Sequence, residues 1–130
     1  MESPDPVTES DKKSSVLVIG GAGYIGSVLV GRMLKRGFRV RVLDKLLYDN
    51  EGAVTGYRDH PEFEFVHGDL CDSFTVERAL DEMDNVVLLA ALVGDPVCKK
   101  HPELAVKINY EGTVRLFDSL NGQGLGRFVF

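Results

Sequence analysis

The sequence predicts an α/β protein built on a doubly wound parallel sheet. Five short runs typical of strands alternate along the 130 residues with segments of helical periodicity, and each helical segment is short enough to be a crossover. One run, Asn85 to Ala91, is almost unbroken in apolar residues, as is typical of a central strand buried on both faces. Because strands joined by helical crossovers lie parallel, we expect helices on both faces of the sheet.

The first strand is predicted at Val16 to Ile19, a short apolar run bounded by polar residues and glycines. A glycine-rich turn follows it, and a helix is expected from about Tyr24 to Arg36, with Gly37 as its C′ residue. The apolar face of this helix is expected to hold Ile25, Val28, Leu29 and Met33.

The remaining elements follow from the same periodicities. Residues 45–61 are expected to form an irregular loop with one short helix, and Asp72 or Ser73 can cap a helix that reaches about Asp81. A long helix is predicted from Pro102 or Glu103 to Leu120. The further strands are predicted at Arg39 to Leu43 (with Asp44 at its end), Phe63 to Val66, Asn85 to Ala91 and from Arg127.

The turn after the first strand has the glycine spacing of a dinucleotide site. Glycines allow the backbone to turn sharply and to approach a pyrophosphate, which would lie against the N-terminus of the following helix. Two registers fit, Gly21-x-Gly23-x-x-Gly26 and Gly20-x-x-Gly23-x-x-Gly26, and the glycines alone do not choose between them. A tight turn that binds nothing is the structural alternative, which the order of strand, turn, helix and acidic residue disfavours.

Asp44 is the acidic residue that the motif requires. It follows Gly26 by 18 positions, where the second strand should end. Its carboxylate can accept hydrogen bonds from the adenosine ribose hydroxyls and disfavours a 2′-phosphate there. Lys45 comes next and could tolerate that phosphate, but the carboxylate would repel it at closer range. We therefore expect NAD as the cofactor, on a fold of the Rossmann type.

The amino-acid composition argues against several classes of function. The net charge is −5 and the basic residues are scattered, which argues against nucleic acid as a partner. Cys71 and Cys98 have no metal-ligand spacing, so free thiols in a reducing compartment and no metal site are expected. No apolar run is long enough to span a membrane and no signal peptide is evident, so we expect a cytoplasmic protein. Residues 1–15 are polar and are expected to be a disordered leader before one domain at 16–130.

Several segments in register resemble the extended short-chain dehydrogenase/reductase family, in particular its NAD-dependent nucleotide-sugar epimerases and dehydratases. The resemblance covers Val16 to Phe130. It is carried by the glycine turn, by Asp44, by Gly68-Asp69-Leu70, by Leu88-Leu89-Ala90-Ala91 and by Ile108-Asn109-Tyr110-Glu111-Gly112-Thr113. Leu89 departs from the pattern, because the family often has a histidine there.

The resemblance implies a role for each of these segments. Asp69 would accept from the adenine amino group and Leu70 would cover the ring, while small residues at the fourth strand's end would leave room for the cofactor. The cofactor-binding residues expected on these grounds are Gly20, Gly23, Tyr24, Ile25, Gly26, Asp44, Asp69, Leu70, Leu89, Ala90, Ala91 and Asn109. The resemblance also implies a homodimer through the helix near 103–120, where Val106, Tyr110, Val114 and Phe117 form a second apolar stripe.

Family chemistry is hydride transfer, with a tyrosine as general base and a lysine four residues later. None of the four tyrosines here has that lysine, so no catalytic residue is assigned and the sequence resembles the amino-terminal part of a longer enzyme, without its catalytic and substrate-binding parts. The parent enzyme would act on a nucleotide sugar. A non-catalytic dinucleotide-binding regulatory or sensor module is the alternative, and a flavoprotein with the same glycine turn is a third possibility.

Overall fold

The computed structural model describes residues 13–46, 52–70, 72–90, 100, 102–120 and 126–129. The strands in these ranges are β1 (Ser15–Ile19), β2 (Arg39–Asp44), β3 (Phe63–His67), β4 (Asn85–Leu88) and β5 (Arg127–Val129). They form one sheet in the order β3-β2-β1-β4-β5, and all four neighbouring pairs are parallel. The chain runs outward from β1 to β3 and then returns to the other side of β1, which confirms the predicted doubly wound fold of the Rossmann type.

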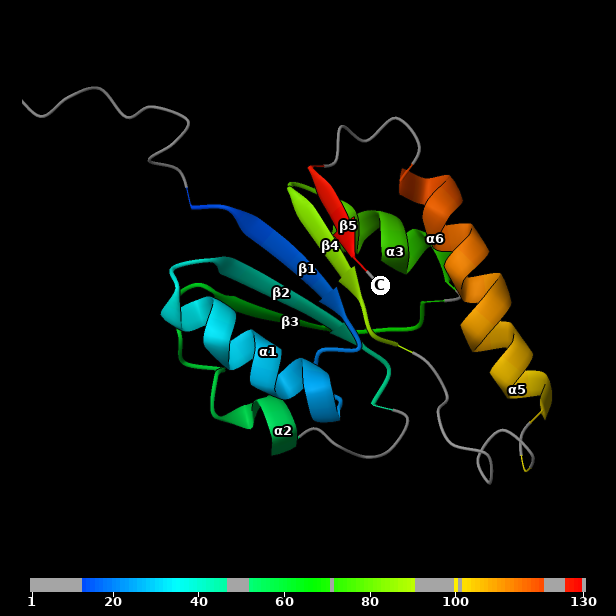
Figure 1. The fold of residues 1–130 in the computed structure, drawn as a ribbon, viewed down its shortest axis with the longest axis horizontal. Helices are drawn as coiled ribbons and strands as arrows, with labels where there is room; N and C mark the ends of the chain where they lie inside the picture. Colours follow the sequence, from blue (N-terminus) through cyan, green and yellow to red (C-terminus); the bar gives the residue numbers. More distant parts are fainter. Residues whose placement is uncertain are drawn as a thin grey trace, which may run out of the picture.

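Helices cover both faces of this sheet (Figure 1). On one face lie α1 (Tyr24–Lys35) and the short α2 (Gly52–Thr55), and on the other lie α3 (Ser73–Leu80), α5 (Pro102–Val106), the π-helical turn η2 (Lys107–Gly112) and α6 (Thr113–Leu120). The side chains of β1 alternate between the two layers, because successive residues of a strand point to opposite faces. Val16 and Val18 pack toward α1, whereas Leu17 and Ile19 pack toward α3 and α6.

The face that α1 buries differs from the predicted one. The buried residues are Gly26, Val30 and Leu34, spaced by four, whereas Ile25 and Val28 are mostly exposed. The other two predicted residues, Leu29 and Met33, are half-buried, and Met33 packs against the core as expected. Gly26 sets the phase of the helix, because the backbone of the glycine turn lies where its side chain would be. The hydrophobic pattern alone pointed to the larger residues and missed the contact that requires the absence of a side chain.

The fourth strand is shorter than predicted and ends at Leu88. The amide of Leu89 still donates to Ile19 O at 2.8 Å, but β1 turns away at Gly20, so the next residue has no strand beside it. The predicted long helix is also present in three consecutive parts, with a π-helical turn between two α-helical segments. Ser15, expected at the end of the leader, is buried as the first residue of β1.

The predicted start of α3 is confirmed, since Asp72 is its N-cap and accepts from Phe74 N at 3.2 Å. Residues 1–12 of the predicted leader, both cysteines, Ala91 and Phe130 lie outside the described residues. Within the described part of the chain, no helix combines the length and the apolar character that crossing a membrane requires.

Candidate functional site

The candidate site begins at Gly20, directly after β1. This glycine has a φ of +88°, a conformation that L side chains rarely adopt, and its amide donates to Leu43 O of β2 at 2.8 Å. A Cβ built there would lie 2.6 Å from Ala90 N, just beyond the end of β4. Both the turn and the close approach to β4 therefore require glycine at this position.

The backbone of the residues that follow packs closely against Gly20. A Cβ at Gly26 would lie 2.5 Å from Gly20 O and 2.7 Å from Gly21 Cα, and one at Gly23 would lie 3.2 Å from Gly20 O. A Cβ at Gly21 instead meets the Val42 side chain. Backbone thus packs on backbone at 20, 23 and 26, and Gly21 is equally close to the buried Val42, so both registers that the sequence left open fit this packing.

This packing presents the start of α1 at the carboxyl edge of the sheet. Gly23 is the N-cap and supplies no side chain to the first amides of the helix, and the first intrahelical bond runs from Ser27 N to Gly23 O at 3.0 Å. Tyr24 and Ile25 are 94% and 66% exposed. The N–H groups of a first helical turn have no intrahelical acceptor, and the helix dipole makes this end partly positive. The arrangement can accept an anion such as a pyrophosphate.

Asp44 ends β2 and lies against the glycine turn. Its Oδ2 accepts from Ala22 N at 2.9 Å, and its Oδ1 accepts from Leu46 N at 2.7 Å. The second bond closes a tight turn in which Leu46 has a φ of +58°. The carboxylate is therefore fixed beside the start of α1, and because each oxygen has further lone pairs it can also accept hydroxyl groups of a ligand.

The end of β3 lies beside Asp44. Gly68 N donates to Asp44 O at 3.1 Å, and Asp69 follows, with its Oδ2 3.2 Å from Lys45 Nζ. Leu70 is 6% exposed and belongs to the core cluster on the α3 face. Little of the Leu70 side chain is available to an adenine ring, and its contact with adenine stays a prediction.

The structure brings most of the predicted residues to one edge. The carboxyl ends of β1, β2, β3 and β4 carry Gly20, Gly23, Tyr24, Ile25, Gly26, Asp44, Asp69, Leu70, Leu89 and Ala90. Ala91 lies outside the described residues, and Asn109 lies in η2 with its side chain outside them. Ligands of open α/β sheets bind at this edge, where the chain switches from one side of the central strand to the other.

Residues 16–130 match the family model described as the NAD dependent epimerase/dehydratase family. The chain belongs to this family. The match covers every strand but the first residue of β1, and it confirms the predicted resemblance. Because the family is NAD-dependent, it also argues against the flavin alternative.

Relatives that match most of this chain are named for different activities. The chain is 34% identical to "UDP-glucose 4-epimerase 3" of Oryza sativa subsp. japonica, over 90% of this chain and 34% of the relative. It is 32% identical to a 3 beta-hydroxysteroid dehydrogenase/Delta 5-->4-isomerase of Mycobacterium tuberculosis, over 88% of this chain and 30% of the relative. The chain therefore spans about a third of the length of the curated relatives it matches.

A solved structure confirms the fold of this family member. The UDP-glucose 4-epimerase of Thermus thermophilus, determined in complex with NAD, is 35% identical and superposes with a TM-score of 0.78. The alignment covers 89% of this chain and 36% of that one. The similarity thus lies in the part of the epimerase that corresponds to the sheet and helices described above.

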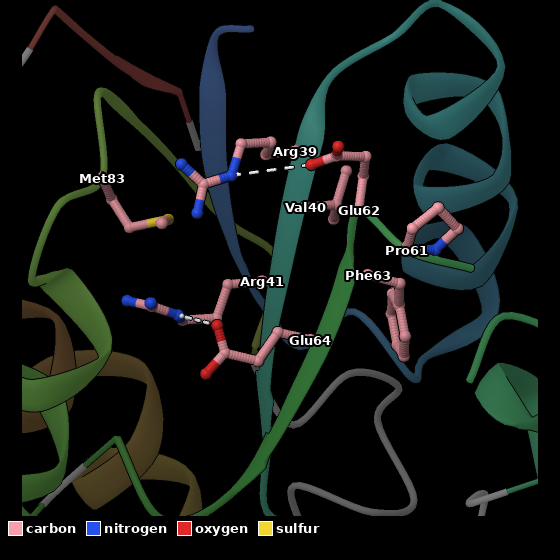
Figure 2. Close-up of a pocket in the computed structure, with 8 residues that line it drawn as sticks. All are labelled: Arg39, Val40, Arg41, Pro61, Glu62, Phe63, Glu64 and Met83. Atoms are coloured by element: carbon pink, nitrogen blue, oxygen red, sulfur yellow. Dashed lines mark hydrogen bonds and ion pairs between the residues drawn. The ribbon is translucent and has the colours of Figure 1, made fainter. Parts of the chain in front are cut away.

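A cavity at the opposite edge of the sheet does not compete with this site. It has a volume of about 90 Å³, too small for a dinucleotide, and lies among the amino ends of β2 and β3 (Figure 2). Its charged groups are already paired: Arg41 Nε lies 2.9 Å from Glu64 Oε2, and Arg39 Nε lies 3.6 Å from Glu62 Oε2. Arg41 also donates to Ala79 O and Asp81 O, at the end of α3. These residues hold sheet and helix together.

The sequence did not reveal two residues that join the ends of β2 and β3. Lys45 pairs with Asp69, and His67 Nε2 lies 2.9 Å from Lys45 O. The sheet register places Asp44 opposite His67, so the two strand ends are neighbours. Pairing the predicted second and third strands in parallel would have brought Lys45 and His67 together, but the sequence does not give the register of that pairing.

Proposed function

We propose that this chain is the NAD-binding part of an enzyme that oxidises a carbon of a nucleotide-linked sugar and then completes an epimerisation or a dehydration. The proposal that the chain binds NAD rests on one observation: the closely packed glycines place the start of α1 beside the fixed carboxylate of Asp44. The sugar part is supported by the family description and by the relatives named as UDP-glucose 4-epimerases. When bound, NAD accepts and returns a hydride.

Each group at the site has a proposed role in holding the coenzyme. The amides of Tyr24 and Ile25, with the helix dipole, would hold the pyrophosphate. Asp44 would accept from the adenosine ribose hydroxyls, and Asp69 would accept from the adenine amino group. Leu89 and Ala90 would lie along the pyrophosphate and the nicotinamide ribose. Ala91 and Asn109 are assigned to the same coenzyme on the family resemblance.

A calorimetric titration of the 130-residue chain with NAD tests this proposal. Asp44→Asn keeps the shape of the side chain and removes its charge, and hydrogen bonds to charged groups contribute about 1.5–3 kcal/mol, or roughly 10- to 150-fold in affinity. We expect a loss of at least about tenfold in this variant. Glu64→Gln makes the matching change at the opposite edge and should bind NAD as the wild type does. Absence of binding to the wild-type chain would overturn the proposal.

We propose that the chain binds NAD without catalysing sugar chemistry by itself. Its tyrosines, Tyr24, Tyr48, Tyr57 and Tyr110, are followed four residues later by Val, Gly, Pro and Val, so the general base and its lysine partner are missing. Incubation of the chain with NAD and UDP-glucose or UDP-galactose, followed by chromatography of the sugars, should show no interconversion. Measurable epimerase activity would contradict this part of the proposal.

A hydroxysteroid is the second candidate substrate of the parent enzyme, favoured by the 32% identical steroid dehydrogenase. The parent enzyme distinguishes the two, because this chain is expected to lack the substrate-binding part. Turnover of UDP-glucose by the parent enzyme supports the first candidate, and oxidation of a 3β-hydroxysteroid supports the second. A parent protein that binds NAD, turns over neither substrate and carries no tyrosine with a lysine four residues later supports the non-catalytic dinucleotide-binding module instead.

We also propose that the chain associates through the helical segment 103–120. Val106, Tyr110 and Val114 are 57%, 68% and 43% exposed, whereas Leu116 on the opposite side is fully buried against the sheet. An exposed apolar stripe on a helix favours burial against another surface. Sedimentation velocity over a concentration series should show a dimer that Tyr110→Glu weakens, and a monomer at every concentration would contradict the proposal.

A further inference from the structure

The pair Lys45–Asp69 bears on which dinucleotide the site accepts. Lys45 directly follows the ribose-binding candidate Asp44, so its ammonium is the nearest cation along the chain to any 2′-phosphate bound there. Within the described part of the chain, however, its ion-pair partner is Asp69 at 3.2 Å and not Asp44. The two side chains are 48% and 31% exposed, so the pair is at the surface and can be broken without disturbing the core.

The backbone of Lys45 is held on both sides, which leaves its side chain as the part that can move. On one side Leu46 N donates to Asp44 Oδ1, and on the other His67 Nε2 lies 2.9 Å from Lys45 O. Gly68 N donates to Asp44 O in addition. These bonds fix where the lysine stem begins, and Asp69 then determines the direction in which its ammonium points.

We propose that Asp69, by holding Lys45, is a determinant of the preference for NAD over NADP; this inference rests on the proposed function. A 2′-phosphate carries nearly two negative charges at neutral pH and would meet the Asp44 carboxylate. An ammonium that reached this phosphate would offset the repulsion. Because Lys45 is engaged by Asp69, the repulsion stays uncompensated and the 2′-hydroxyl form is favoured.

The experiment is a double-mutant cycle on the ratio of the Kd for NADP to the Kd for NAD, measured by calorimetry on the full chain. The variants are Asp69→Asn, Lys45→Met and the double variant. The ratio separates the inference from the role of Asp69 in adenine binding, because both dinucleotides carry the same adenine and a loss there cancels. Asp69→Asn is isosteric and Lys45→Met keeps the length of the stem, so each is expected to fold.

Asp69→Asn should lower the ratio by about two- to fivefold, the range expected for an exposed ion pair. In the Lys45→Met background the same change should leave the ratio unaltered, because no ammonium is left to release. A ratio that does not respond to Asp69→Asn, or that responds equally in both backgrounds, overturns the inference while NAD binding stands. Failure of the wild-type chain to bind either dinucleotide overturns the proposed function itself.

Discussion

The two edges of the sheet differ in how their polar groups are satisfied. We call the edge where the strands begin the amino edge and the edge where they end the carboxyl edge. At the amino edge, polar groups satisfy one another: Ser15 Oγ accepts from Asp84 N at 2.8 Å and lies 3.1 Å from both Glu82 O and Asp84 Oδ2. Arg39 and Arg41 of β2 pair there with Glu62, just before β3, and with Glu64 of β3 (Figure 2). At the carboxyl edge, glycines replace side chains and the first helical amides of α1 face outward without a side-chain cap.

This difference separates groups that hold the fold together from groups that can hold a ligand. A buried polar group is costly unless it is paired, so the paired groups of the amino edge contribute to folding. Uncapped amides at an exposed helix start can instead exchange water for an anion. A change at the amino edge should therefore alter stability alone, and a change at the carboxyl edge should alter NAD binding.

The largest effect is expected for Gly26→Ala at the carboxyl edge. The new methyl group would lie 2.5 Å from Gly20 O and 2.7 Å from Gly21 Cα, and backbone atoms cannot move aside as a flexible side chain would. We expect a loss of about 3 kcal/mol or more in the free energy of unfolding, at the upper end for overpacked sites, together with loss of NAD binding. Chemical denaturation and calorimetry measure the two effects.

Gly56→Ala is the control for this prediction. Among the described residues nothing lies within 4 Å of a Cβ built at Gly56, so the change should be close to neutral. If Gly26→Ala were as stable as Gly56→Ala and bound NAD normally, the close packing of the glycine turn would not be what forms the site.

At the amino edge, Arg41→Met should have the next largest effect. The guanidinium donates to Ala79 O at 2.8 Å, to Asp81 O at 2.7 Å and to Glu64 at 2.9 Å, and its side chain is 13% exposed. Hydrogen bonds from charged groups contribute strongly, so we expect a loss of about 2 kcal/mol in unfolding free energy. The affinity for NAD of the folded variant should not change.

Arg39→Met supplies the comparison for Arg41. Arg39 makes a longer contact of 3.6 Å with Glu62, and its side chain is 50% exposed. Removal of such a surface pair should change the stability by less than about 1 kcal/mol. Equal effects of the two substitutions in denaturant titrations would show that charge alone, and not the bonds to the end of α3, accounts for the role of Arg41.

The amino edge was also the part that the sequence predicted least. The positions of the strands and helices and the glycine turn follow from local patterns, and the carboxyl-edge candidates Gly20, Gly26 and Asp44 were predicted because a local motif specifies them. The bonds of Arg41 to α3 join residues 38 and 40 positions apart, and no local pattern specifies such pairs. The buried face of α1 was predicted only in part for a related reason, because Gly26 makes a long-range contact that no local pattern specifies.

Ser15→Ala should have a smaller effect at the same edge. It removes the hydroxyl that accepts from Asp84 N and ties the turn before β4 to β1. We expect a loss of about 1 kcal/mol in unfolding free energy, because Asp84 N loses its partner in a partly buried position, and no change in NAD affinity. Ser73→Ala, at an exposed position of α3, should be nearly neutral, and a weaker NAD affinity in Ser15→Ala would contradict the separation of the two edges.

Glu62→Gln should have the smallest effect, and the effect should depend on pH. The hydrogen bond from Lys13 is the largest influence on Glu62 and lowers its pKa below the ordinary value of 4.5. Burial comes second and raises the pKa, and the charges of Lys13, Arg39 and His60 lower it further. A carboxylate with a lowered pKa stabilises the fold above its ordinary pKa, and this contribution is lost as the pH falls through the lowered value.

Denaturant titrations of the wild type and Glu62→Gln, begun at neutral pH and carried into acid, measure this contribution. The wild type should be slightly more stable at neutral pH, and the difference should disappear once the carboxyl group of Glu62 is protonated and the pair with Lys13 loses its charge. Added salt should reduce the difference at neutral pH, because the pair is at the surface. A difference that grew on acidification would have the wrong sign and would show that the charge pairs of the amino edge do not stabilise the fold.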